Sequence, residues 1–321
     1  MRYLVPLIIW SVLYWSCSKI DRDQASLSLS NGKVVRVENF KSKFVPQRNI
    51  DIWLPDNYST NKEYAVLYMH DGQMLFDTTN SWNKQEWGVD ETIHQLWKTK
   101  EIRNTIVVGI WNTEFRHSEY FPQKPFENLT TEFQKALLDI GVQNQGAPLF
   151  KTEIYSDNYL KFIVEELKPF IDNKYSTKSD MKNTFIAGSS MGGLISLYAI
   201  CEYPEIFYGA ACLSTHWVGI FDTLNNPIPI SFVEYLEDNL PSAQNHLLYF
   251  DYGTETLDAL YEPYQLMIDS VLTRSHYTIH NWKTLKFEGE DHSEKAWNKR
   301  LHIPIKFLLN NENEINKNQD M

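Results

Sequence analysis

The chain has 321 residues, 43% of them hydrophobic, which is enough to bury the core of one large globular domain. Its formal net charge of −11 argues against a nucleic-acid partner, because a phosphate backbone attracts basic surfaces. Only three cysteines are present, and their spacing matches no zinc motif. We therefore expect no metal site.

The first 17 residues read as an export signal. Arg2 precedes an apolar run from Leu4 to Trp15 that is too short to span a bilayer comfortably. The Ser16-Cys17 pair at its end resembles a bacterial lipoprotein processing site, in which Cys17 would carry the lipid. We expect an exported protein, periplasmic or at the cell surface, that contacts a membrane only through a lipid anchor at Cys17. Ordinary cleavage and an uncleaved anchor are the alternatives.

After a polar tether over 18–32, the pattern predicts strands that alternate with helices. Strands are expected over 33–40, 48–55, 65–69, 105–111, 208–215, 246–253 and 284–289. Helices are expected over 90–97, 159–173, 261–275 and 294–309, and a strand, a turn and a helix share 184–200. This alternation indicates an α/β protein with a mostly parallel twisted sheet covered by helices on both faces. We assign one domain over 33–309, followed by a polar tail over 310–321.

The segment 112–158, between two of these predicted elements, is long and mixed. It is rich in aromatic residues and prolines. Long insertions in compact domains are usually functional. We therefore expect this segment to take part in function.

Three glycines crowd the junction in TFIAGSSMGGLISLYAI, residues 184–200. The sequence GSSMG fits G-x-S-x-G between a strand and a helix, which is the setting of a nucleophile elbow. The sharp turn lifts Ser190 above the sheet, and the positions two before and two after it crowd each other, so both are glycine. We predict Ser190 as a nucleophile; an inert serine in a structural turn is the alternative.

A serine hydroxyl needs a base and an orienting carboxylate to attack at neutral pH. In chains with such an elbow the partners follow in the order serine, acid, histidine. His292 lies in an acidic, glycine-containing loop after the last predicted strand, KFEGEDHSEKAW, and is the expected base. His216 directly follows another strand and is a candidate to line the pocket.

The orienting acid is expected in the loop GTETLDALYEP, after the strand LLYFDYG. Asp258 is preferred, because Asp is the commoner member of such triads and this residue is far enough from the strand to reach the histidine loop. Glu255 is the alternative acid. Asp251 lies within the strand, where we expect a structural role.

The oxyanion of an ester's tetrahedral intermediate needs two N–H donors. One is expected from Met191, the residue after the nucleophile. The other is expected from the loop in MHDGQMLFD, where Gly72 permits a tight turn that leaves the N–H of Gln73 free to point inward.

Several segments together resemble the esterase family of α/β-hydrolases that includes esterase D, enterochelin esterases and feruloyl or acetylxylan esterases. They are RNIDIWLPDNY, LYMHDGQMLFD, EELKPFID, GSSMGG and GEDHSEKAW, and the resemblance covers roughly residues 34–309. The resemblance implies the α/β-hydrolase fold and a hydrolase that needs no metal or organic cofactor. It also implies the roles given above for Ser190, His292 and Gln73, with an acid after the seventh strand.

The resemblance further implies substrate-binding residues. Arg116, Glu119 and Tyr120 match a loop that commonly borders the active site. Trp217, in LSTHW, matches an aromatic residue that often lines the acyl or sugar pocket. Relatives often carry a proline-containing version of this segment, so the pocket is expected to differ here.

We therefore predict a serine carboxylic-ester hydrolase that acts through an acyl-enzyme on an acylated carbohydrate or a phenolic ester. Aromatic residues of the insertion could stack on such rings, or could equally pack beneath a long loop. A siderophore ester hydrolase of enterochelin type, which would use Arg116 and Lys124, is an alternative. An acyltransferase and a catalytically inert exported binding protein of the same fold are two more.

Overall fold

The computed structural model describes residues 29–79, 81–140, 148–221 and 224–311. The predicted export signal with Cys17, and most of the predicted tether and tail, lie outside the described residues. Of the tail, Asn310 pairs with Ile102 in an isolated bridge, so the folded body includes this residue. Within the described ranges, no helix has the length and apolar character needed to cross a membrane.

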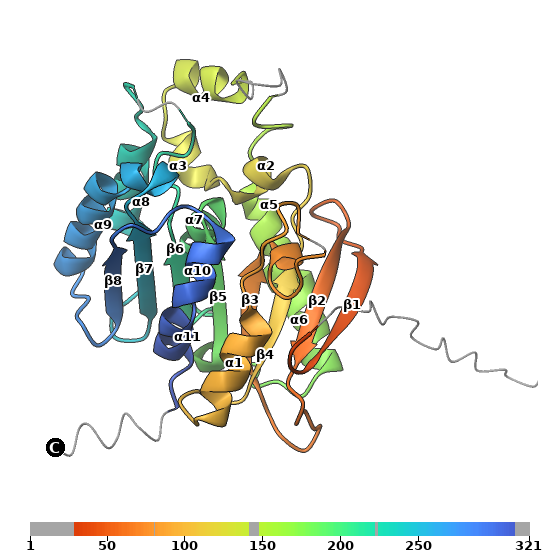
Figure 1. The fold of residues 1–321 in the computed structure, drawn as a ribbon. Helices are drawn as coiled ribbons and strands as arrows, with labels where there is room; N and C mark the ends of the chain where they lie inside the picture. The colour runs from red at the N-terminus through yellow and green to blue at the C-terminus, as the bar shows by residue number, and fades with distance from the viewer. Residues whose placement is uncertain (1–28, 80, 141–147, 222–223, 312–321) are drawn as a thin grey trace, which may run out of the picture.

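Eight strands form one sheet in the order β1-β2-β4-β3-β5-β6-β7-β8 (Figure 1). The strands are β1 (Lys33–Phe40), β2 (Arg48–Leu54), β3 (Ala65–His70), β4 (Thr105–Ile110), β5 (Thr184–Ser189), β6 (Gly209–Leu213), β7 (Leu247–Gly253) and β8 (Trp282–Phe287). β2 runs antiparallel to both of its neighbours, and all other pairs are parallel. The predicted mostly parallel sheet is confirmed.

Helices cover both faces of the sheet (Figure 1). One face carries α1 (Val89–Lys98), α10 (Glu294–Arg300) and α11 (His302–Leu309), and the other carries α5 (Ser156–Lys161), α6 (Lys168–Lys174), α7 (Met191–Glu202), α8 (Ile228–Asn239) and α9 (Glu262–Arg274). Side chains alternate across β3: Leu67 faces the layer of α1, α10 and α11, and Tyr68 faces the layer on the other side of the sheet. This two-sided burial explains why the strand reads as a continuous apolar run.

Several helices differ from the predicted pattern. The insertion folds into three short helices, α2 (Arg116–Tyr120), α3 (Gln123–Glu127) and α4 (Thr131–Leu138), and α8 was not predicted either. The helix expected over 159–173 begins at Ser156 and includes a π-helical segment over Phe162–Leu167. The final helix is divided at Leu301 into α10 and α11.

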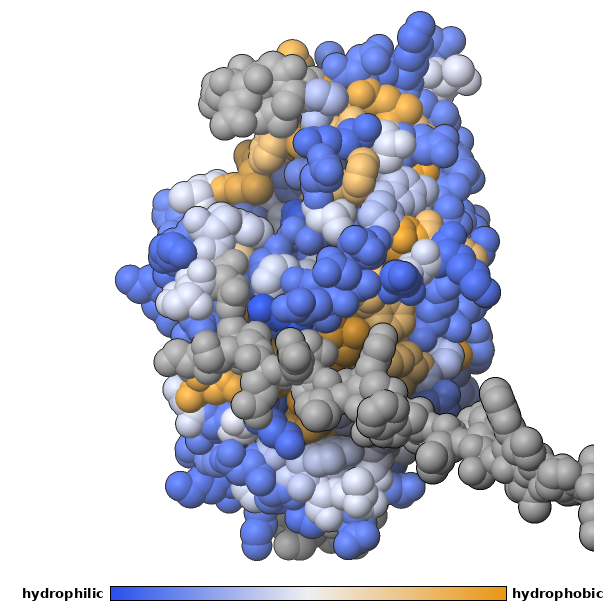
Figure 2. All heavy atoms as spheres, turned by 90° about the vertical axis from the view of Figure 1, so that its right-hand side faces the viewer, coloured by the Kyte–Doolittle hydropathy of each residue, from blue (hydrophilic) through white to orange (hydrophobic). Residues whose placement is uncertain are grey.

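β1 is an edge strand of the sheet, and Figure 2 views the molecule from its side. Hydrophilic residues cover most of this face, and apolar residues show only in separate patches (Figure 2). A polar covering discourages an edge strand from pairing with another chain.

A buried ion pair ties the insertion to the sheet. Arg48, at the start of β2, donates from Nη1 to Glu119 Oε2 at 2.8 Å and from Nη2 to Oε1 at 2.5 Å. Neither side chain is more than 1% exposed. The resemblance led us to expect Glu119 beside the active site, and the structure instead buries it as the partner of Arg48.

Replacing one member of this pair should strongly destabilise the protein, because the other charge would stay buried without a partner. We expect Glu119→Ala to lower the free energy of unfolding by about 3–5 kcal/mol. Urea denaturation monitored by Trp fluorescence measures this change. Glu237→Ala removes an exposed partner of Arg274 and serves as the matched control, with an expected change below about 1 kcal/mol. Equal losses in the two variants would contradict the prediction.

Candidate active site

Ser190 occupies a sharp turn between β5 and α7. Its φ of 57° and ψ of −122° lie outside the usual regions for a non-glycine residue. A Cβ on Gly188 would lie 2.7 Å from backbone atoms of Gly192, a contact that real side chains do not make. The predicted reason for these two glycines is confirmed.

The end of β6 anchors this turn. The N–H of Ser190 donates to the carbonyl of Leu213 at 2.9 Å, and the N–H of His216 donates to the carbonyl of Ser190 at 3.2 Å. A Cβ on Gly193 would lie 2.9 Å from Thr215 Oγ1, so the start of α7 packs closely against the same segment. The unusual backbone of Ser190 is therefore held from two sides.

His292, in the loop after β8, meets an acid supplied by the loop after β7. Its Nδ1 donates to Asp258 Oδ1 at 2.5 Å. The other carboxylate oxygen, Oδ2, accepts from the N–H of Gly253 and from Ser214 Oγ, each at 2.6 Å. Asp258 is fully buried, whereas Glu255 is exposed. Of the two acids considered from the sequence, the structure brings Asp258 to the histidine.

Backbone contacts fix the acid loop against the histidine loop. The N–H groups of Thr254 and Glu255 both donate to the carbonyl of Glu290, at 3.0 and 3.1 Å. The N–H of His292 donates to Thr256 Oγ1 at 2.9 Å. A Cβ on Gly253 would lie 2.1 Å from the Glu290 carbonyl oxygen, so only glycine permits this approach.

Behind Asp258 lies a second buried carboxylate that sequence reasoning had left as structural. Asp251 accepts from Arg300 Nη2 at 3.0 Å, and the same nitrogen donates to Ser214 Oγ at 3.0 Å. Trp297 Nε1 also donates to Ser214 Oγ, at 2.9 Å. Ser214 Oγ thus accepts two hydrogen bonds and donates one to Asp258. Nothing in the sequence around Arg300 or Ser214 indicated this network, apart from the place of Ser214 at a strand end.

The ring of Tyr261 lies beside that of His292. The Tyr261 and His292 ring centroids are 5.9 Å apart. Burial raises the pKa of Tyr261 well above its usual range, and the charge of Asp258 acts in the same direction, while the nearby Ser190 hydroxyl lowers it in part. The described hydrogen bonds of His292 go to Asp258 and Thr256, not to Ser190. Hydrogen bonds between a nucleophile and its base are often long in free enzymes and tighten when substrate binds.

The two predicted oxyanion donors lie in neighbouring loops. Gln73 belongs to a 3₁₀ turn over Gly72–Met74 that follows β3, and Met191 is the first residue of α7. Within the part of the chain that the structure describes, neither N–H has an acceptor. A Cβ on Gly192 would lie 3.4 Å from His70 Cβ, so the two loops pack side by side. This arrangement leaves two free donors near the Ser190 turn.

Arg116 reaches the edge of this region as the partner of Asp71. Its Nε donates to Asp71 Oδ1 at 2.8 Å and its Nη2 to Oδ2 at 2.7 Å, and Asn112 Nδ2 adds a third bond at 2.6 Å. Burial alone would raise the pKa of Asp71, but Arg116 and Asn112 hold that pKa below its ordinary value. The Arg116 side chain is 20% exposed. A substrate that contacted it, as predicted, would therefore meet a guanidinium already paired with Asp71.

The other two predicted substrate-binding residues are buried in packing positions. Tyr120 has no exposed surface, and its ring packs against His70 and Tyr159. Trp217 is 1% exposed and donates from Nε1 to Gln265 Oε1 at 3.0 Å. Neither ring presents a surface on which a substrate could stack. We therefore correct this expectation and assign both side chains to the core.

Three histidines around the site, the buried His70 and His216 and the half-buried His117, are held neutral. Burial lowers the pKa of His70 to about 3 and that of His117 to about 4, and nearby arginines add to the effect. Burial also lowers the pKa of His216 well below its ordinary value, and the neighbouring His292 acts in the same direction.

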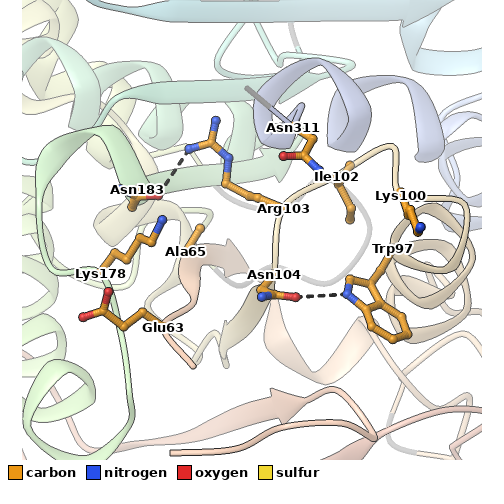
Figure 3. Close-up of a pocket in the computed structure, with 10 residues that line it drawn as sticks. All are labelled: Glu63, Ala65, Trp97, Lys100, Ile102, Arg103, Asn104, Lys178, Asn183 and Asn311. Carbon is orange, nitrogen blue, oxygen red and sulfur yellow. Dashed lines mark hydrogen bonds between the residues drawn. The ribbon is translucent and has the colours of Figure 1, made fainter. Parts of the chain in front are cut away.

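A separate cavity of about 260 Å³ lies at the opposite edge of the sheet (Figure 3). Residues just before β4 and β5 and at the start of β3 line it, among them Asn104, Asn183 and Ala65. Arg103 Nη1 donates to Asn183 Oδ1 at 3.2 Å, and Trp97 Nε1 donates to Asn104 Oδ1 at 3.0 Å (Figure 3). These side chains join segments of the fold at the amino ends of the strands, far along the strands from Ser190.

Comparison with models of protein families shows which family this chain belongs to. Residues 43–137 and 149–302 match the model of the family described as "Putative esterase". The matched residues make up well over half of the chain. The chain therefore belongs to this esterase family.

Individual relatives agree with this assignment. The uncharacterized protein YbbA of Bacillus subtilis is 25% identical over 172 residues, which is 53% of this chain and 58% of YbbA. A siderophore enterobactin esterase of Emericella nidulans is 27% identical over 167 residues, 51% of each chain. The chain thus spans about half the length of the curated relatives it matches. A solved ferulic acid esterase superposes with a TM-score of 0.61 at 17% identity, covering 87% of this chain and 98% of the esterase, and shows the same α/β-hydrolase fold.

Because His70 is neutral when folded, it should make the protein less stable in acid. An unfolded histidine binds a proton near pH 6.5, so between about pH 6.5 and 3 the unfolded state binds more protons than the folded state. As the pH is lowered across this window, the free energy of unfolding should decrease, by up to ~1.4 kcal/mol per pH unit from this residue.

We expect His70→Asn to reduce this slope by about one proton, since an amide can keep the bond to Tyr159 now made by Nδ1. Urea denaturation at several pH values measures the slope. An unchanged slope in His70→Asn would show that His70 is protonated in the folded protein.

Proposed function

We propose that this protein is a serine carboxylic-ester hydrolase that works through an acyl-enzyme. The observation that carries the proposal is the 2.5 Å contact between His292 Nδ1 and the buried Asp258, which accompanies a serine on a strained strand-to-helix turn at the same edge of the sheet. The esterase family to which the chain belongs supports this reaction class.

In the proposed reaction, His292 Nε2 takes the proton of Ser190 while Oγ attacks the ester carbonyl carbon. The N–H groups of Gln73 and Met191 stabilise the oxyanion that forms. His292 returns the proton to the leaving alcohol, which leaves Ser190 acylated. Water then attacks the acyl-enzyme with His292 as base, and Asp258 keeps the imidazole oriented and stabilises its cation.

For the substrate we propose an ester with an aromatic, phenolic acyl group. The aromatic side chains of the insertion that we considered for ring stacking are largely buried, so they support neither a sugar nor a phenolic ring. Phe221 is instead 59% exposed, and its ring centroid lies 5.9 Å from that of His216, which contacts the nucleophile turn. The fold shared with a ferulic acid esterase is consistent with this choice.

The siderophore alternative has weaker support in the site. It relied on Arg116 and Lys124 to meet catecholate charge, but Arg116 is paired with Asp71 and Lys124 with Glu202. The related enterobactin esterase keeps this alternative as the second candidate. Transfer of the acyl group to an alcohol would follow from the same intermediate.

Export and lipid attachment at Cys17 are part of the proposal. They rest on the sequence of the first 17 residues. Metabolic labelling with a fatty-acid analogue in wild type and Cys17→Ala tests them.

Replacing Asp258 and Glu255 one at a time should show which of these two carboxylates in the loop after β7 is needed for activity. We expect Asp258→Asn to lower kcat for p-nitrophenyl acetate by about 10⁴-fold, because the amide would favour the wrong tautomer of His292. Glu255→Gln, in the same loop but exposed, is the matched control and should keep wild-type turnover. Ser190→Ala should abolish acyl-enzyme formation, seen as the loss of the acyl mass on the intact protein. Full activity in Ser190→Ala or Asp258→Asn would overturn the proposal.

Removing the exposed ring near the site should test the substrate class. We expect Phe221→Ala to lower kcat/KM for methyl ferulate by about tenfold, the equivalent of ~1.4 kcal/mol, while hydrolysis of p-nitrophenyl acetate changes little. Leu266→Ala, at another exposed apolar residue on α9, is the control. Turnover of an enterobactin-type trilactone in preference to methyl ferulate would favour the alternative.

A further inference from the structure

The loop that carries Gln73 turns at Asp71, whose backbone is left-handed. Asp71 has a φ of 56° and a ψ of 45°, a region that residues other than glycine seldom adopt. Its carbonyl accepts from the N–H of Met74 at 2.8 Å, which closes the turn around Gln73. A backbone of this kind persists where surrounding contacts hold it. The direction of the Gln73 N–H therefore depends on what holds Asp71.

Two side chains from outside the loop hold the Asp71 carboxylate. Arg116 binds both of its oxygens, with bonds of 2.8 and 2.7 Å, and Asn112 Nδ2 adds a bond of 2.6 Å to Oδ1. The backbone N–H of Asn112 also donates to Gln73 Oε1 at 3.2 Å. Asn112 follows β4 and Arg116 begins α2, so these contacts tie the loop to two other segments of the fold.

The same carboxylate lies beside the nucleophile turn. A Cβ on Gly192, two residues after Ser190, would lie 3.6 Å from Asp71 Oδ2. The Asp71 side chain is only 9% exposed, so water screens its charge weakly. Without a cation, this charge would oppose the negative charge that develops on the ester oxygen. Arg116 supplies that cation.

We propose that Arg116 is a positioning residue for the oxyanion hole. Through Asp71 it fixes the loop that presents the Gln73 N–H, and its charge offsets the carboxylate beside the nucleophile. The guanidinium commits Nε and Nη2 to Asp71 and lies 5.1 Å from the centroid of the buried Tyr120 ring, so this role needs no contact with substrate. The inference rests on the proposed function and deepens it.

Kinetics with p-nitrophenyl acetate separate this role from substrate binding. Arg116→Gln should lower kcat by about 10²-fold and change KM little, because an oxyanion donor acts in the transition state. Asp71→Asn, which leaves no unpaired carboxylate, should lower kcat by about tenfold. Lys168→Gln is the matched control, since Lys168 and Asp172 form a pair of similar burial on α6, and it should keep the wild-type kcat. A raised KM with unchanged kcat in Arg116→Gln would overturn the proposal.

The double variant tests whether Arg116 acts through Asp71. Arg116→Gln with Asp71→Asn should recover about tenfold of the kcat lost in Arg116→Gln alone, because it removes the carboxylate left without a partner. A double variant as slow as Arg116→Gln, or slower, would overturn the proposal. Arg116→Lys keeps the charge without the two-bond contact and should lie between wild type and Arg116→Gln. It also provides the comparison if Arg116→Gln does not fold.

A trifluoromethyl ketone reports on the oxyanion hole without turnover. Ser190 Oγ adds to its carbonyl carbon, the hydroxyl proton passes to His292, and the carbonyl oxygen becomes an oxyanion. The inhibition constant should rise in Arg116→Gln and Asp71→Asn by the same factors as kcat/KM falls. Unchanged inhibition in these variants would overturn the proposal.

Hydrogen exchange of the Met74 amide, followed by NMR without ligand, reports on the loop itself. Exchange should be faster in Arg116→Gln and Asp71→Asn than in wild type, and unchanged in Lys168→Gln. Wild-type exchange in all three variants would overturn the proposal. If exchange responded as expected while the wild-type protein neither hydrolysed esters nor bound the ketone, the hold of Arg116 on the loop would be supported and the proposed hydrolase function would fail.

Discussion

The organisation of the site depends on one buried carboxylate. Asp258 has no exposed surface, and burying an ionised carboxylate costs several kcal/mol unless polar partners replace its water. Gly253, Ser214 and His292 provide those partners at 2.5–2.6 Å. Each partner belongs to a different strand end or the loop after it, from β6, β7 and β8. The parallel register of these three strands is therefore a condition for satisfying Asp258, and through it for orienting His292.

The second half of the site depends on the point where the chain order of the sheet reverses. β3 lies between β4 and β5, and the loops after β3 and β5 meet at the carboxyl ends of these strands, the place where ligands bind at a switch point in an open α/β sheet. Gly192 packs against His70 at the end of β3, and Gly72 packs closely against the backbone of Gly109 and Ile110 at the end of β4. The free N–H groups of Gln73 and Met191 are a consequence of this arrangement. Both halves of the site therefore lie along the carboxyl edge of one sheet.

Much of this arrangement could be predicted from the sequence, because strong local patterns encode it. The buried parallel strands read as short apolar runs, and the requirement for Gly188 and Gly192 arises within the turn that holds Ser190. Gly72, expected to permit a tight turn, instead packs against the backbone of Gly109 and Ile110 in β4. The preference for Asp258 over Glu255 followed from its reach, and the structure brings this acid to His292.

Other features could not be predicted, because they depend on contacts between distant segments. Ser214, Arg300 and Asp251 meet only once β6, β7 and α10 are packed together, and no local pattern indicates such a network. The same applies to Tyr261, which the fold brings to His216 across 45 positions of sequence. Tyr120 and Trp217 were misassigned because an aromatic residue in a loop or at a strand end looks the same in sequence whether it packs inward or faces a ligand.

The insertion between β4 and β5 therefore contributes to specificity less directly than its length suggested. Its charged residues are committed to the fold, Glu119 to Arg48 and Arg116 to Asp71, and most of its aromatic rings fill the core. The segment after β6 differs, since it combines the buried His216 with the exposed ring of Phe221 within six residues. This segment also holds the carbonyl of Ser190 through the N–H of His216. A substitution in this segment would alter both the contact with substrate and the geometry of the nucleophile. We therefore expect differences in specificity among relatives of this fold to be concentrated there.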